Sequence, residues 1–497
     1  MGRAPVANDC MSDVPLHAGK LAVAAPIPLV IDLDGTLLRS DLLVETALLF
    51  VRDQPHRILV PLQWLAQGKA ALKHQLAHAT ELDVSALPYE QSVIEFAKVE
   101  RARGRQVILA TASHLLLAHR VAAHLGLFDE VIATDADRNL SANAKRDVLV
   151  QAYGVLGFDY CGNSRDDLPV WSAARQAYVV NASPAVERRA REMGNFAGVL
   201  DSERPVLHDW IKALRVHQWL KNLLIFVPLL AAHRYTELPL VLDALLAFLC
   251  FSLCASSVYI LNDLLDLRDD RNHASKRSRP FAAGRLSLQS GAIAFPALLA
   301  CAFGLGLWQL PLVFSAGLAT YYVLTLAYSL SLKRRMVVDV ITLAGLYTLR
   351  IIVGAVTLDI PLSFWLLAFS MFMFLSLALV KRYAELLQVH AQGSKQKAKG
   401  RGYFPDDLPI IASLGAASGY MAVMVLAFYI NDPGTAQQYR HPQLIWLACP
   451  LLLTWISRVW MLAHRGKMNE DPVIFAVKDR MSLAMGALLA VVFWAAI

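Results

Sequence analysis

From about residue 206 to its C-terminus, the chain alternates apolar runs with short charged loops. A membrane-spanning helix needs roughly 20 consecutive apolar residues. Nine runs reach or approach that length: 218–234, 238–261, 288–309, 311–331, 336–357, 361–380, 408–430, 441–463 and 480–497. In a chain that is 56% hydrophobic, this pattern predicts a C-terminal all-α membrane domain of about nine transmembrane helices over residues 206–497, with 218–234 as the shortest span.

Basic residues are unevenly distributed between the loops. The loops after the second, fourth, sixth and eighth runs are rich in Lys and Arg, whereas the opposite loops offer only Arg234 and Arg440. The positive-inside rule places the basic loops in the cytoplasm. We therefore predict a multi-pass protein of the inner (cytoplasmic) membrane, with a cytoplasmic N-terminal domain. The same distribution explains the formal charge of +7 without nucleic acid as a partner.

The first 205 residues carry charges throughout and predict a soluble domain. Residues 1–25 read as a tail that lacks the pattern of a signal peptide. Over 26–205, short apolar strands alternate with helical patterns, as in a parallel sheet with helices on both faces. Residues 42–105 form a helical insertion that we interpret as a cap over an active site. Its apolar segment, 58–65, is expected to pack inside the protein, with the bilayer as the alternative.

Four polar motifs in this α/β domain end predicted strands or open the element that follows. They are Asp32 with Asp34, Thr111, Lys145, and Asp166 with Asp167. Since active sites of parallel sheets lie at the carboxyl ends of the strands, we expect these motifs to meet there. Of two carboxylates two residues apart, one can attack phosphorus while the other transfers a proton.

The order of all four motifs resembles that of the haloacid dehalogenase-like phosphatases, which have a Rossmann-like fold. The resemblance implies that Asp32 is a nucleophile forming an aspartyl-phosphate and that Asp34 is general acid and then base. It implies that Thr111 binds the phosphoryl group and that Lys145 neutralises its charge. It also implies a Mg²⁺ ion held by Asp32, the backbone carbonyl of Asp34, and Asp167.

One position departs from the phosphatase pattern. Asn163 stands where family members commonly carry an acidic residue, which lowers the expected affinity for metal and leaves Asp166 as an alternative ligand. A catalytically inactive domain of the same fold is the alternative to a working phosphatase.

A second acidic cluster follows the apolar run 238–261. Read as a continuing helix, Asp263, Asp266 and Asp270 share one face, with Asn262 beside them. Hard oxygen ligands in this arrangement suit Mg²⁺, which is often held by one or two carboxylates plus substrate phosphates. Cations for phosphate groups follow at Lys276, Arg277 and Arg279. A solvated charged loop is the alternative interpretation.

Further charged and polar residues fall on the same predicted side of the membrane. Two of them, Asp339 and Arg350, lie inside apolar runs, where ionisable residues are costly and usually face a cavity or a partner. The sequence therefore predicts a cytoplasm-facing cavity rich in cations. Its other members are Arg215, Lys221, Tyr328, Lys333, Lys381 and Arg382.

The segments QWLKN, NDLLDLRDDRNHASKRSRP, YSLSLK and KRYAEL resemble the UbiA superfamily of intramembrane prenyltransferases over roughly residues 210–497. More narrowly, they resemble its decaprenyl-phosphate phosphoribosyltransferase branch. That branch transfers phosphoribose from phosphoribosyl pyrophosphate to a polyprenyl phosphate. The usual second aspartate motif is reduced here to Asp339, which favours the phosphoribosyl branch.

The resemblance implies a role for each candidate residue. Asn262, Asp263, Asp266 and Asp270 would hold Mg²⁺ on the donor diphosphate, with Asp263 and Asp266 essential to catalysis. The donor phosphates would contact Arg277 and Arg279, and Lys276 is a further candidate for that contact. The lipid phosphate or the departing diphosphate would be held by Lys221, Lys333, Lys381 and Arg382, and Tyr328 is a further candidate for binding substrate.

Together the two halves imply a bifunctional enzyme with one Mg²⁺ at each site. Its partners are phosphoribosyl pyrophosphate, a polyprenyl phosphate and the bilayer, and homo-oligomerisation is compatible with this interpretation. The phosphatase would remove the 5-phosphate of the transferase product, giving polyprenyl-phosphoryl ribose for glycans of the cell wall. One alternative is a UbiA enzyme that prenylates an aromatic or other acceptor beside an independent or inactive phosphatase domain. Another is a transporter or lipid-binding scaffold with a regulatory domain.

Overall fold

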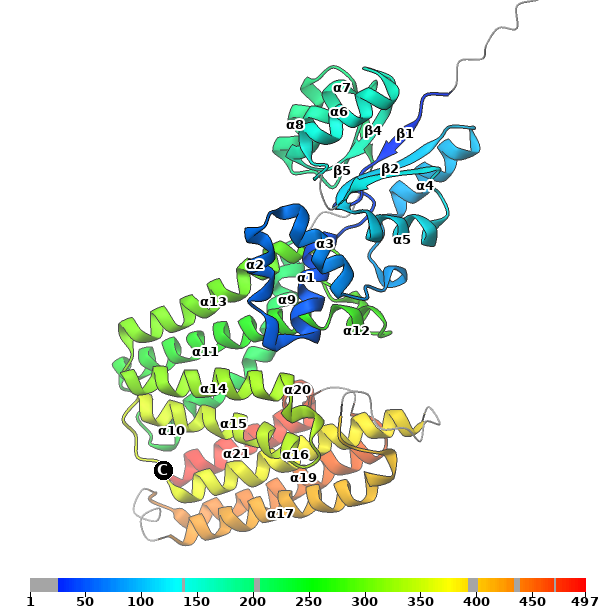
Figure 1. Cartoon of the computed structure of the whole chain (residues 1–497). Helices are drawn as coiled ribbons and strands as arrows, with labels where there is room; N and C mark the ends of the chain where they lie inside the picture. The colour runs from blue at the N-terminus through cyan, green and yellow to red at the C-terminus, as the bar shows by residue number, and fades with distance from the viewer. Residues whose placement is uncertain (1–25, 136–138, 201–205, 392–400, 433–438, 469–470) are drawn as a thin grey trace, which may run out of the picture. The chain divides into compact units, whose positions relative to one another are not determined.

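The computed structural model describes residues 26–135, 139–200, 206–391, 401–432, 439–468 and 471–497 (Figure 1). The predicted tail, 1–25, lies outside these residues. The described chain forms two compact units. The first contains residues up to Leu38, Gly68–His74 and Tyr89–Ser202, and the second contains Arg39–Gln67, Gln75–Pro88 and the chain from Glu203 onward.

The first unit is built on a six-stranded parallel sheet of order β3-β2-β1-β4-β5-β6. The strands are β1 Leu29–Ile31, β2 Val107–His114, β3 Glu130–Thr134, β4 Asp159–Gly162, β5 Gln176–Val180 and β6 Phe196–Leu200. The central strand β1 is fully buried, as expected for a parallel sheet that is covered on both faces. The predicted α/β fold is confirmed.

Helices cover both faces of this sheet. On one face, α6 Ala142–Tyr153, α7 Leu168–Ala173 and α8 Pro184–Glu192 pack around Trp171 and Val30. On the other, α4 Gln91–Ala102 and α5 Leu115–Leu125 contact β2. The helices cover the two faces of the sheet, and the polar motifs lie at the carboxyl ends of the strands.

The insertion at 42–105 is helical, as predicted. It contains α1 Leu42–Asp53, η1 Pro55–Arg57, α2 Val60–Ala66, α3 Lys69–Ala79, η2 Val84–Ala86 and α4. Its α1 and α2 group with the second unit, so the insertion is divided between the two. The expected burial of 58–65 is wrong: Leu59 and Leu62 are 68% and 62% exposed. In the seven-residue α2, the Trp64 ring packs edge-on against Phe50.

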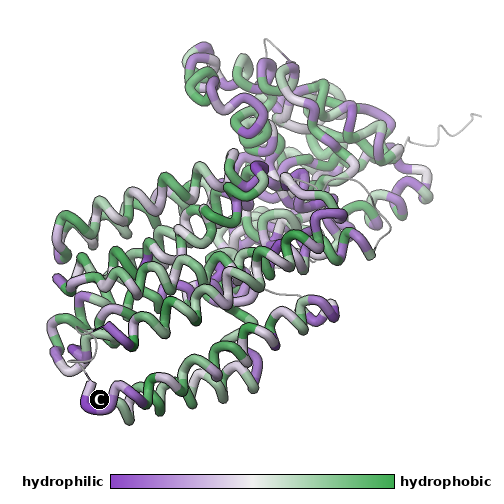
Figure 2. Tube along the Cα trace, turned by 90° about the horizontal axis from the view of Figure 1, so that it is seen from below, coloured by the Kyte–Doolittle hydropathy of each residue, from purple (hydrophilic) through white to green (hydrophobic). Residues whose placement is uncertain are grey.

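The second unit is a helical bundle whose long helices are largely apolar (Figure 2). Seven helical segments among the described residues are long and apolar enough to cross a membrane. They are Leu238–Leu265 (α11), Leu288–Gln309 (α13), Leu312–Leu330 (α14), Val338–Thr357 (α15), Phe364–Ala391 (α16), Pro405–Asn431 (η7 and α17) and Pro442–His464 (η8 and α19). The pair α20 Pro472–Lys478 and α21 Arg480–Ala496, bent by 81°, raises this count to eight if it forms one span.

The expected span at 218–234 corresponds to an apolar helical segment, Val216–Ala231, that is shorter than the seven. This segment forms a 3₁₀ stretch, η4 Val216–Phe226, and a short helix, α10 Val227–Ala231. Two polar residues explain the difference, because Lys221 and Asn222 are buried and bonded to other parts of the bundle. Pro228 then opens the short helix. The remaining short elements are α9 Leu207–Leu214, α12 Leu267–Arg271, η5 Lys276–Ser278 and η6 Leu332–Arg334.

Candidate active sites

The first candidate site lies at the carboxyl ends of β1 and β4. Asp32 follows β1 directly, and its backbone N–H donates to the carbonyl of Cys161 on β4. The Lys145 ammonium, in the first turn of α6, donates to Asp32 Oδ1 at 2.7 Å and lies 3.6 Å from Asp167 Oδ1. All three side chains are buried. The fold therefore brings the nucleophile candidate, the lysine and the acidic residue after β4 together.

Asp167 is held firmly in this cluster. Its Oδ1 accepts from the Tyr160 hydroxyl at 2.7 Å, and its Oδ2 accepts from the backbone N–H groups of Asn163 and Ser164. The Asn163 amide lies over Gly35, where an added Cβ would meet Asn163 Nδ2 at 2.0 Å. Asp166, the alternative ligand, is exposed. The geometry thus favours Asp167 over Asp166.

Asp34 and Thr111 meet through a residue that sequence reasoning missed. The Ser113 hydroxyl donates to Asp34 Oδ2 at 2.6 Å, and the Ser113 N–H donates to Thr111 Oγ1 at 2.9 Å. The pairing register of β2 with β3 shifts between Thr111 and His114, the stretch that contains Ser113. The only signal in the sequence was a serine two residues after the motif threonine.

In this cluster the buried carboxylates of Asp32 and Asp167 share the Lys145 ammonium. Burial raises the pKa of Asp32 to about 6, and Lys145 opposes that rise. Burial would lower the pKa of Lys145, but Asp32 and Asp167 together raise it. Carboxylate oxygens of Asp32 and Asp167 form the hard donor set that Mg²⁺ prefers. These residues fit a magnesium ion and a phosphoryl group.

The second candidate site surrounds the end of α11. The helix predicted to continue through the acidic cluster breaks at Asp266, which separates α11 from α12. Asp263 Oδ1 accepts from Arg215 at 2.5 Å and from Arg279 at 3.1 Å, and Arg279 also donates to Asp270 Oδ2 at 2.6 Å. One guanidinium therefore bridges two carboxylates that are both buried.

The geometry of this bridge indicates whether the carboxylates could also bind a metal ion. Asp263 and Asp270 both contact Arg279 Nη1, and Asp266 lies between them in the sequence. Carboxylates that converge on one cationic nitrogen can also converge on a divalent metal ion. The Asn262 amide N–H donates to Ser329, which leaves its oxygen as a further ligand atom. The donor set fits Mg²⁺. Of the three cations that follow, Arg279 contacts the cluster, whereas Lys276 and Arg277 are exposed.

Lys333 belongs to the surroundings of the same cluster. It lies half-buried in η6. Burial lowers the pKa of the Lys333 ammonium, and the nearby Asp266 carboxylate opposes that change.

Lys221 and Lys381 converge on a carboxylate that the sequence analysis did not single out. Asp471 Oδ2 accepts from Lys221 at 2.7 Å and from Lys381 at 2.9 Å. Asp471 also caps α20 by accepting from the Val473 N–H. Burial alone would raise the pKa of Asp471, but Lys381 and Lys221 hold it well below its usual range. Two ammonium groups that donate to one carboxylate oxygen could bind a phosphate oxygen in the same way.

Arg382 is placed differently from the other candidate cations. Its guanidinium is 1% exposed and donates to Asp339 Oδ2 at 2.5 Å, to the Tyr328 hydroxyl at 2.8 Å and to Glu385. Asp339 accepts a second bond from Tyr403. Arg382, Asp339 and Tyr328 thus form a closed internal network. Arg350 is likewise occupied, by Asn222 and Tyr321.

Comparison with known proteins decides the family. The profile of the UbiA prenyltransferase family matches residues 223–486, which is more than half of the chain. The chain belongs to the UbiA prenyltransferase family. A second profile, haloacid dehalogenase-like hydrolase, matches residues 29–172. This UbiA protein is therefore a multi-pass membrane enzyme, a transferase fused to an N-terminal haloacid dehalogenase-like domain.

Three relatives differ in how much of this two-domain chain they match. Uncharacterized protein y4nM of Sinorhizobium fredii is 37% identical over 94% of this chain and 90% of its own length. Nodulation protein NoeC of Azorhizobium caulinodans is 38% identical over 57% of this chain and 92% of its own. The decaprenyl-phosphate phosphoribosyltransferase of Mycolicibacterium smegmatis is 32% identical over 54% of this chain and 86% of its own. The last two relatives thus match only about half of this UbiA chain.

Proposed function

We propose that this enzyme transfers 5-phosphoribose from phosphoribosyl pyrophosphate to a polyprenyl phosphate and releases diphosphate. The observation that carries the proposal is the carboxylate cluster in which Asp263 and Asp270, on either side of Asp266, converge on Arg279. Asp339, which stands where a second acidic motif would be, is fully buried and neutralised by Arg382. Similarity to the Mycolicibacterium smegmatis enzyme over 86% of its length supports the same donor.

In the transfer step, an oxygen of the lipid phosphate attacks the anomeric carbon of the ribose while the bond to diphosphate breaks. Mg²⁺ at the carboxylate cluster would offset the charge of the leaving group. Arg279, already between Asp263 and Asp270, is the cation best placed to contact the donor phosphates. The paired Lys221 and Lys381 provide positive charge for the lipid phosphate.

We further propose that the N-terminal domain removes the 5-phosphate to leave polyprenyl-phosphoryl ribose. Asp32 would attack phosphorus, and Lys145 would balance the charge that develops on the phosphoryl oxygens. Asp34, oriented by the Ser113 hydroxyl, would protonate the leaving ribose oxygen and then activate water. Both sites would face the cytoplasm, and their fusion raises the effective concentration of the intermediate.

Lipid analysis tests the two steps together. Wild type and Asp32→Asn are incubated with Mg²⁺, phosphoribosyl pyrophosphate and a polyprenyl phosphate, and the lipids are identified by mass. The proposal predicts the ribosyl lipid from wild type and the phosphoribosyl lipid from Asp32→Asn. If both proteins release the same lipid, still bearing its phosphate, the coupling of the two domains is wrong.

A further inference from the structure

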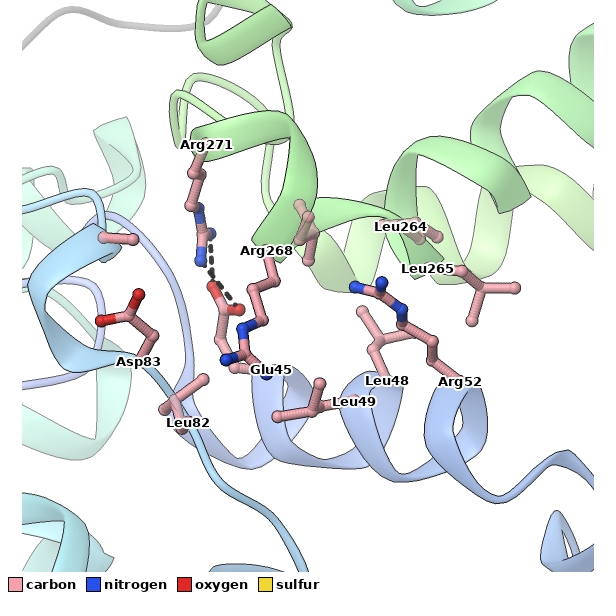
Figure 3. Close-up of a pocket in the computed structure, with 12 residues that line it drawn as sticks. Glu45, Leu48, Leu49, Arg52, Leu82, Asp83, Leu264, Leu265, Arg268 and Arg271 are labelled. Atoms are coloured by element: carbon pink, nitrogen blue, oxygen red, sulfur yellow. Dashed lines mark hydrogen bonds and ion pairs between the residues drawn. The ribbon is translucent and has the colours of Figure 1, made fainter. Parts of the chain in front are cut away.

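Helix α1 of the insertion packs on the acidic segment of the transferase. Val44 and Leu48 join an apolar cluster that contains Leu264 and Leu267, which flank Asp266, and Phe281. All of these residues belong to the same compact unit. Figure 3 shows α1 running beside this segment, and Leu48, Leu49, Leu264 and Leu265 line the same pocket between them. The insertion therefore contributes to the structure of the transferase.

A buried ion pair joins the two segments. Glu45 of α1 accepts from Arg271 of α12 through both oxygens, at 2.6 and 3.1 Å, and the side chains are only 3% and 7% exposed (Figure 3). Arg271 Nε also donates to the carbonyl of Ala282 at 3.0 Å. One guanidinium thus ties α1 to α12 and to the loop after Arg279. Arg271 directly follows Asp270, so this tie acts next to a carboxylate of the proposed donor site.

Three other contacts hold the same stretch of chain. Arg52 donates to Asp269 at 2.6 Å, and Gln289 donates to Asp41 at 2.9 Å. Gly284, at φ +69°, lies so close to the edges of the insertion that an added Cβ would come within 2.6 Å of the Arg39 Cβ. The segment from α12 to the start of α13 is therefore held against the insertion at Asp269, near Gly284 and at Gln289.

We infer that Glu45 is a positioning residue of the transferase, which acts through Arg271 to keep Asp263 and Asp270 convergent on the donor diphosphate and its metal. The inference rests on the proposed donor site. Partners that orient metal ligands from outside typically contribute about 10- to 100-fold to metal affinity or activity. A bidentate, buried carboxylate–arginine pair next to a ligand is a contact of this kind.

The test measures binding of inorganic diphosphate in the presence of Mg²⁺, by titration calorimetry of the full-length protein. Glu45→Gln should weaken binding about tenfold, and Glu45→Asp, which keeps the charge, should recover much of that loss. Glu237→Gln is the matched control. It removes the carboxylate of an exposed ion pair at the opposite end of α11, about 40 Å along the helix. This control should bind diphosphate like wild type.

Steady-state kinetics separate positioning from simple stability. A positioning role predicts a higher KM for the donor in Glu45→Gln, whereas a purely structural role would lower kcat with the folded fraction and leave KM unchanged. Wild-type affinity for diphosphate in Glu45→Gln would overturn the inference. If Glu45→Gln does not fold, Arg271→Lys is measured in its place, because lysine keeps the charge but cannot form all three hydrogen bonds of the arginine. Wild-type affinity of Arg271→Lys for diphosphate would also overturn the inference.

The outcome is separable from that of the proposed function. Diphosphate is common to phosphoribosyl pyrophosphate and to prenyl diphosphates, so the binding assay does not depend on which donor is used. If wild type does not consume phosphoribosyl pyrophosphate, the proposed function fails while the role of Glu45 is still measured. If wild type consumes it and Glu45→Gln binds diphosphate normally, only the present inference fails.

Discussion

Replacing Asp471 with Asn tests whether Lys221 and Lys381 form a phosphate-binding pair. Both ammonium groups lie within 3 Å of one carboxylate oxygen, at 2.7 and 2.9 Å. Without the carboxylate charge, two ammonium groups about 5 Å apart would repel by about 3 kcal/mol at an effective dielectric constant of about 20. Because Lys381 is partly exposed, this figure is an upper estimate of the loss in the free energy of unfolding.

Thermal unfolding in detergent at pH 7, with and without a polyprenyl phosphate, measures the effect. Asp471→Asn should unfold at a lower temperature than wild type, and the lipid phosphate should stabilise the variant more, because it supplies the missing negative charge. Asp479→Asn is the control, since Asp479 also caps a helix but pairs with Arg458. Equal stabilisation of both variants by the lipid would refute the assignment of the two lysines.

Three further predictions concern the two sites and the bundle. Because burial raises the pKa of Asp32 to about 6, the carboxylate is protonated below that pH. Hydrolysis of p-nitrophenyl phosphate at low Mg²⁺ should therefore rise between about pH 5 and pH 7, and Lys145→Met should shift the rise to higher pH; a flat profile would contradict this. Asp263→Asn should abolish transfer without changing the elution profile of the protein, and retained transfer would exclude Asp263 from the donor site. Gly354→Ala should lower stability by about 1–3 kcal/mol, because its Cβ would lie 2.3 Å from a backbone oxygen of η4, whereas Gly345→Ala, which meets nothing within 4 Å, should not.

The parts of the fold that follow from local pattern could be predicted. Seven apolar runs of about 20 residues correspond to seven helices, because the bilayer sets a length that periodic apolar sequence reveals. The four phosphatase motifs also meet as expected, since each lies at the end of a parallel strand or the start of the helix after it. The run at 218–234 corresponds to a shorter helical segment, because Lys221 and Asn222 find their partners inside the bundle.

Residues that act across long separations could not be predicted. Asp471 is 250 residues from Lys221 and 90 from Lys381, so no spacing in the sequence links them. Glu45 and Arg271 are 226 residues apart and lie in segments that looked like separate domains. Ser113 was closer to its motif, but a serine after a strand is common. In each case the partner is chosen by tertiary packing.

The identity of the donor tests the central claim most directly. The full-length protein is incubated with Mg²⁺ and a polyprenyl phosphate, and the release of diphosphate is compared between phosphoribosyl pyrophosphate and prenyl diphosphates. The carboxylate cluster at Asp263, Asp266 and Asp270, with Asp339 held by Arg382, predicts release from phosphoribosyl pyrophosphate that depends on the polyprenyl phosphate. Release from a prenyl diphosphate, with phosphoribosyl pyrophosphate left intact, would contradict it.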